Sequence, residues 1–139
     1  MVHALDEIRR VLLPDGILID LRPLADRWPV EVISQRECQQ TGHVTDLPLG
    51  LEDDMAANQA MADAESRGWF LREQEEFFPI HYVWDTPSEM EEWIETEWEG
   101  FISLGEDARR ATRSVWAVGD ADCRVRVQAK LLITKWKKL

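Results

Sequence analysis

The stretch E-I-R-R-V-L-L-P-D-G-I-L-I-D-L-R-P, residues 7–23, decides the fold, because a helix, a turn and a strand follow one another in it. Pro14-Asp15-Gly16 ends the helix and turns the chain. Residues 17–21 are apolar except at Asp20, the pattern of a short strand covered on both faces. The helix before the turn has one apolar face, formed by Leu5, Ile8 and Leu12. These residues predict one helix–strand step of a layered sheet.

The middle of the chain alternates predicted strands with predicted helices. Two extended runs in residues 30–46 favour a hairpin, and the alanine-rich residues 51–67 favour a helix. Residues 75–85 read as a strand with both faces covered or nearly so. Pro79 cannot donate a hydrogen bond to a neighbouring strand, so we expect this strand at an edge of the sheet.

The last third begins with a strong helix start. Thr86-Pro87-Ser88-Glu89 is a capping box with proline at the first helical position, and apolar residues follow at helical spacing to Ile102. A shorter helix is expected over 108–118. A long half-exposed antiparallel strand is expected over 124–136, with its inward residues alternating: Val125, Val127, Ala129, Leu131 and Ile133.

This order of elements resembles the second half of the Rossmann-like class I S-adenosylmethionine-dependent methyltransferases. Residues 7–23 resemble the late helix, the "RVLKPGG"-type turn and the fifth strand of that family, and the two late strands resemble its sixth and seventh. The resemblance covers nearly all of 1–139. It implies a single truncated α/β domain (α+β as truncated) with strands 17–21, 123–136 and 75–85, the last strand antiparallel, helices packed on the sheet, and an extra hairpin near 30–46.

The cofactor half of that family has no counterpart in this sequence. The family carries a glycine-rich turn after its first strand, whereas the seven glycines here never fall as G-x-G. We therefore expect a methyltransferase-like half-domain that is not catalytic alone and binds no cofactor. S-adenosylmethionine would bind only if another chain supplied the missing half, which is the split-enzyme alternative. A second alternative is a small aromatic-lined module for an apolar or cationic ligand.

Composition limits the partners and the compartment. The net charge is −11, with −3 over residues 1–49, −15 over 50–107 and +7 over 108–139, which disfavours nucleic acid as a partner. No apolar run is long enough to span a membrane. Cys38 and Cys123 lack C-x-x-C spacing, so we expect reduced thiols in the cytoplasm. The three histidines lack metal-ligand spacing, and no metal site is predicted.

One rim of the predicted sheet gathers side chains that could face a ligand. If the sheet resembles that of the family, the strand ends at this rim hold Arg22, His81, Trp84, Asp85 and Cys123. Structural roles compete with this hypothesis: Arg22 suits a strand-end salt bridge, and His81 a packed edge position. The glutamates of residues 89–99 follow the polar face of one helix and are interpreted as solvated surface.

The strand 17–21 should have one open edge, because the family's fourth strand is missing. Open backbone N–H and C=O groups require a partner. We expect either that the 30–46 hairpin covers this edge or that a second copy does so in a two-fold homodimer, and we favour the homodimer.

Overall fold

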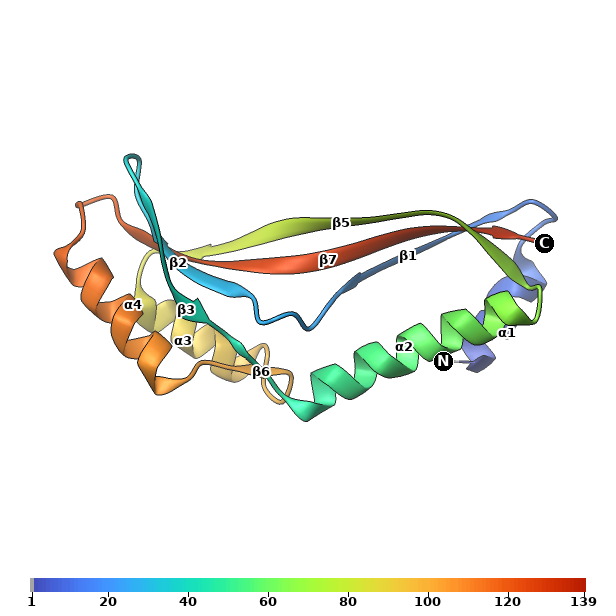
Figure 1. Ribbon diagram of the computed structural model, residues 1–139, viewed down its shortest axis with the longest axis horizontal. Helices are drawn as coiled ribbons and strands as arrows, with labels where there is room; N and C mark the ends of the chain where they lie inside the picture. The colour runs from blue at the N-terminus through green and yellow to red at the C-terminus, as the bar shows by residue number, and fades with distance from the viewer. Residues whose placement is uncertain (1) are drawn as a thin grey trace. The chain divides into compact units, whose positions relative to one another are not determined.

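The computed structural model describes residues 2–139, over which the chain forms four helices and seven strands (Figure 1). The chain divides into two compact units. Unit 1 holds the described residues up to Leu24, together with Glu52–Phe78 and Leu131–Leu139; unit 2 holds Ala25–Leu51 and Pro79–Lys130. The strands β5 (Phe70–Trp84) and β7 (Arg124–Lys138) and the helix α2 (Pro48–Ser66) contribute residues to both units.

Unit 1 begins with the predicted helix, turn and strand. The helix α1 spans Val2–Val11, and the strand β1 spans Ile17–Pro23. Between them Asp15 adopts a left-handed backbone with φ of 62°, and the N–H of Gly16 donates to the carbonyl of Leu13 at 2.9 Å. β1 pairs antiparallel with β7, Ile17 lying opposite Lys137. The predicted antiparallel direction of the last strand is confirmed for this pair.

The core of unit 1 lies on one face of its sheet. α1 contributes Leu5 and α2 contributes Met61, and both pack against Phe70 of β5 and Trp136 of β7. Each of these four side chains is at most 6% exposed. The apolar stripe of the first helix is therefore used as predicted, with Ile8 and Leu12 packed on the same cluster.

The other face of the unit 1 sheet is open, which corrects two predictions. Strand 17–21 is not covered on both faces, because Ile17, Ile19 and Leu21 are 42–56% exposed. Residues 71–79 of β5 are exposed on both faces, so strand 75–85 is not covered as expected either. Among the described strands β5 pairs only with β7, and its predicted edge position is confirmed.

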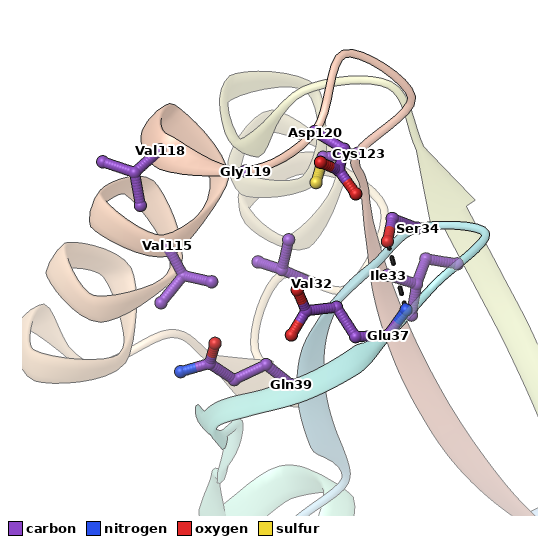
Figure 2. A pocket seen from close by; sticks show the side chains of 10 residues that line it. All are labelled: Val32, Ile33, Ser34, Glu37, Gln39, Val115, Val118, Gly119, Asp120 and Cys123. Carbon is purple, nitrogen blue, oxygen red and sulfur yellow. Dashed lines mark hydrogen bonds between the residues drawn. The ribbon is translucent and has the colours of Figure 1, made fainter.

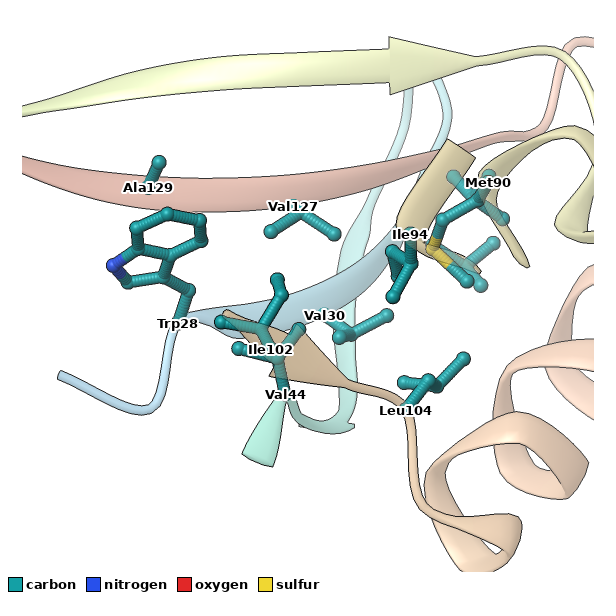
Figure 3. Packing of buried hydrophobic residues seen from close by; sticks show 11 residues of the cluster. Trp28, Val30, Val44, Met90, Ile94, Ile102, Leu104, Val127 and Ala129 are labelled. Carbon is teal, nitrogen blue, oxygen red and sulfur yellow. The ribbon is translucent and has the colours of Figure 1, made fainter. Parts of the chain in front are cut away.

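Unit 2 is built on the hairpin of β2 (Pro29–Ile33) and β3 (Cys38–His43), which confirms the hairpin prediction. β2 also pairs antiparallel with β7, Val30 lying opposite Val127. Two short strands, β4 (Thr45–Asp46) and β6 (Ile102–Ser103), pair with each other. Figure 3 shows the core of this unit, which is formed by Trp28, Val30, Val32, Val44, Met90, Ile94, Ile102, Leu104, Val125, Val127 and Ala129.

Two helices complete unit 2. α3 (Pro87–Thr96) begins with the predicted capping box, in which Thr86 Oγ1 accepts from the N–H of Glu89 at 3.2 Å. α3 ends earlier than the apolar pattern suggested, because the chain turns through Gly100, at φ of 80°, and Ile102 enters β6. α4 spans Glu106–Val118 and ends at Gly119.

The fold is mixed α+β with an antiparallel sheet. β7 is the central strand: β1 and β2 pair with it, and so does β5, while β3 extends the sheet from β2. Every strand pair with a defined register is antiparallel. The hairpin pairs with β7 rather than with β1, so the alternative in which it pairs along the free edge of β1 is wrong.

The buried side chains of β7 do not alternate throughout as predicted. Val125, Val127 and Ala129 are buried in unit 2, but in unit 1 the buried residues are even-numbered: Leu132, Thr134 and Trp136. The predicted inward positions of Leu131 and Ile133 are therefore wrong. The reason is that unit 1 packs its helices on the even-numbered side chains of the strand.

The register of β7 in unit 2 can be tested with two neighbouring aspartates. Val127 is fully buried and Gln128 is half-buried. We expect Val127→Asp to cost about 3 kcal/mol or more in unfolding free energy, because an unpaired charge enters the core. Gln128→Asp should cost less than about 1 kcal/mol. Chemical denaturation of both variants measures the difference, and equal losses would contradict the register.

Candidate functional site

Three of the five predicted rim residues are brought together in unit 2. The indole N–H of Trp116 donates to the carbonyls of Asp85, at 3.2 Å, and Cys123, at 3.3 Å. The carboxylate of Asp85 accepts from Arg124 at 2.6 Å. Trp84 precedes Asp85 at the end of β5. His81 lies exposed on the same strand, so it does not pack as an edge histidine.

Arg22 belongs to unit 1 and is held there by structural contacts. Its guanidinium donates to Asp20 at 3.1 Å and to the side chain of Asn58 in α2 at 2.6 Å. The side chains of Arg22 and Asp20 are only 16% and 18% exposed. This is the strand-end salt bridge that the sequence suggested as the alternative to a ligand contact.

The tryptophan-rich surface is a packed cluster of rings. Tyr82 lies edge-on to Trp98 with ring centroids 4.8 Å apart, and Trp98 also packs edge-on against Trp28 and Trp84. Trp93 lies 6.2 Å from Trp84. Because the rings of this cluster pack on one another and on the core of unit 2, their main role is burial.

A hollow of about 270 Å³ lies between the β2–β3 hairpin and the end of α4 (Figure 2). It is the candidate functional site. The hairpin supplies one wall, and the last turn of α4 with the following turn supplies the other. The lining residues are Val32, Ile33, Ser34, Glu37, Gln39, Val115, Val118, Gly119, Asp120 and Cys123. Cys123 is the one predicted rim residue among them, and none of the lining residues is aromatic.

Close contacts hold α4 against the hairpin and so fix one wall of the hollow. The hydroxyls of Thr41 in β3 and Thr112 in α4 share a hydrogen bond of 2.6 Å, and Thr112 is fully buried. A Cβ atom at Gly42 would collide with Ala108 of α4. The absence of a side chain at Gly42 therefore allows the helix to approach the strand closely.

The mouth of the hollow is ordered by turn hydrogen bonds. Ser34 Oγ accepts from the N–H groups of Arg36 and Glu37, both at 3.2 Å, and the N–H of Cys123 donates to the carbonyl of Asp120 at 3.0 Å. Gly119 leaves space for the thiol of Cys123, because a Cβ atom there would overlap its sulfur.

The chemistry of the hollow is that of a small binding site. Its floor is apolar, through Val32 and Val115, and the carboxylates of Glu37 and Asp120 have no cationic side-chain partner within residues 2–139. In the part of the chain that the structure describes, no group of three or more His, Cys, Asp or Glu side chains could hold a metal ion.

Cys38 lies on the hairpin beside a partly buried ion pair. Glu31 of β2 accepts from Arg126 of β7 at 2.6 Å, and Arg126 also donates to the sulfur of Cys38 at 3.4 Å. Burial and the negative charge of Glu31 raise the pKa of the Cys38 thiol above its usual value, although Arg126 opposes this. A raised pKa reduces the thiolate fraction of Cys38 at neutral pH.

The sequence interpretation missed an ion-pair network between α3 and α4. Glu91 is only 5% exposed, so the solvated role predicted for this helix face is wrong at that position. Its carboxylate accepts from Arg109 at 3.0 Å and from Arg113 through two nitrogens, and Arg109 also binds Glu95. The matched i, i+4 spacing of Glu91 with Glu95 and of Arg109 with Arg113 was the available signal.

Comparison with known proteins gives no relative from which a function could be taken. Protein-family models, curated proteins and solved structures all yield no match to this chain. Within residues 2–139, none of the helices combines the length and the apolar character needed to cross a membrane.

The Glu91 network should make stability depend on pH. Hydrogen bonds from Arg113 and the nearby charge of Arg109 lower the pKa of Glu91 below its ordinary 4.5. A lowered folded-state pKa stabilises the protein above the unfolded-state pKa, and this stabilisation is lost as the pH falls through the folded-state value. We expect Glu91→Gln to cost about 2 kcal/mol at pH 7 and progressively less in acid.

Urea unfolding from pH 7 down to pH 3 measures this difference. Glu92→Gln is the matched control, because Glu92 is the exposed neighbour on the same helix. If the two variants lose equal stability at pH 7, the network does not contribute as the geometry indicates.

Proposed function

We propose that this chain is a methyltransferase-like half-domain that is not catalytic alone. It corresponds to the acceptor-side part of a class I S-adenosylmethionine-dependent methyltransferase sheet. The observation that carries the proposal is the sheet order in unit 1, where β7 lies between β1 and β5 and runs antiparallel to β1. The resemblance implies this same order for the fifth, seventh and sixth strands.

The direction of β5 also supports the proposal. Glu73 pairs with Lys135 in unit 1, and Asp85 pairs with Arg124 in unit 2, so residue numbers rise along β5 as they fall along β7. β5 is therefore antiparallel to β7, as the seventh strand of the family is to its neighbours. The helix, turn and strand of residues 2–23 precede this sheet as the resemblance requires.

The free edge of β1 gives the half-domain a place for a further strand. Within the described residues β1 pairs only with β7, which leaves a row of backbone donors and acceptors on its other edge. A complementary chain that carries the cofactor half would pair here, as the split-enzyme alternative requires. A second copy of the chain is the other candidate for this edge. Cys38 and Cys123 are free thiols, which suits a half-domain that works in the reducing cytoplasm.

The proposal predicts that the chain alone does not bind S-adenosylmethionine. The glycine-rich turn that would let a helix amino terminus approach the cofactor is missing from residues 1–139. Isothermal titration with S-adenosylmethionine and with S-adenosylhomocysteine should show no heat of binding. A dissociation constant in the low micromolar range for either compound would contradict the proposal.

A small-molecule binding module is the second candidate function, and the hollow in unit 2 is the observation that favours it. The aromatic lining that the sequence suggested is replaced there by valines and the carboxylates of Glu37 and Asp120. An apolar floor with carboxylates beside it suits a small organic cation with a short apolar body.

Paired probes test this second candidate. n-Butylammonium combines a cation with a short apolar chain, and n-butanol is its neutral counterpart. We expect n-butylammonium at millimolar concentration to raise the melting temperature and n-butanol to leave it unchanged. The Glu37→Gln, Asp120→Asn double variant should lose the shift, because it removes both carboxylates from the hollow. It should still fold, because both side chains are exposed and no described side chain pairs with them. A shift that survives in the double variant would exclude the hollow as its origin.

A further inference from the structure

The open face of the unit 1 sheet is apolar, although no described element covers it. An antiparallel sheet with one solvated face normally carries polar side chains there. Here Ile17, Ile19 and Leu21 of β1 are 42–56% exposed, and Leu71 and Phe77 of β5 are 46% and 54% exposed.

Strand register places these side chains on one face. Ile19 lies opposite Lys135 and Leu21 lies opposite Ile133, so both β1 residues share the face of the odd-numbered β7 residues. Lys135 Nζ lies 2.8 Å from Glu73 Oε2, which puts Glu73 on the same face. Leu71 and Phe77 lie two and four residues from Glu73 along β5, and strand alternation gives them the same orientation.

The charged side chains on this face have ion-pair partners, including Glu75, which accepts from Arg72 at 3.2 Å. Lys135 is neutralised by Glu73, and Lys137 lies 2.8 Å from Asp15. Because each chain has a net charge of −11, the acidic surfaces of one copy repel those of another. The open face is a surface where two copies can meet without like-charge repulsion.

We propose that a second copy of this chain covers the open face of the unit 1 sheet, in a two-fold face-to-face dimer. The five exposed apolar residues present on the order of 500 Å², so two faces bury about 1,000 Å² in total, the size at which specific interfaces begin. We expect an interface of this size to give a weak dimer.

A dimer through the free edge of β1 would not satisfy the same surface. Two antiparallel β1 strands related by a two-fold axis present the same face to the same side of the joined sheet. The apolar rows of both copies would then lie side by side and remain in water. The second copy therefore binds the open face of the unit 1 sheet, and the free edge of β1 stays available to a strand from a complementary chain.

Sedimentation of the full chain tests the proposal. At tens of micromolar we expect a species of twice the 16.2 kDa chain mass. Leu71→Arg and Phe77→Arg, made separately, should each shift the protein to monomer. Both positions lie on β5, which β7 separates from β1, so neither substitution touches the β1 edge. Met55→Arg is the matched control, because Met55 is 70% exposed on α2, the helix that packs on the other face.

Each outcome decides between named alternatives. Circular dichroism should show that both β5 variants remain folded, and 1 M sodium chloride should preserve the wild-type dimer because its interface is apolar. A wild-type monomer at all concentrations would overturn the proposal. A dimer that survives both β5 substitutions would also overturn it, in favour of the β1 edge. Failure to bind S-adenosylmethionine, or success, leaves this result unaffected.

Discussion

Antiparallel hydrogen bonding along β7 is the constraint on which the rest of the structure depends. In unit 1 this strand pairs with β1, and in unit 2 it pairs with β2, while β5 also pairs with it. Each unit then covers a different set of its side chains: Leu132, Thr134 and Trp136 in one, and Val125, Val127 and Ala129 in the other. Because β1 uses one edge to pair with β7, its other edge is free, and because β2 pairs with β7, the hairpin joins the same sheet.

Buried charge fixes helix placement where apolar contacts alone would allow sliding. Glu91 and two arginines join α3 to α4, and Glu31 with Arg126 joins β2 to β7. Removing one partner of such a pair is costly because the other loses its compensating charge. Both networks lie within unit 2, where one joins α4 to α3 and the other joins the hairpin to β7.

The sequence predicted the positions of helices and strands better than it predicted which of their side chains are buried. Proline, glycine and capping signals located the Pro14–Gly16 turn and the start of α3, since these features act within a few residues. Period-two alternation located β7 but not its change of buried side chains after Ala129, because burial depends on which distant helix packs there. The rim hypothesis placed Trp84, Asp85 and Cys123 near one another, yet the hollow is lined by Glu37, Asp120 and hairpin residues that only tertiary packing brings to α4.

The position of β7 in the sequence has a consequence for synthesis on the ribosome. Residues 124–138 follow the other helices and strands described within residues 2–139, yet both units need them as the strand to which earlier strands pair. Ile17 must therefore wait until Lys137 has been made before it meets its partner. Until then, β1 and the hairpin are strands without a sheet. Such long-range pairing slows folding, and it leaves the apolar side chains of β1 exposed to other nascent chains until β7 has been made.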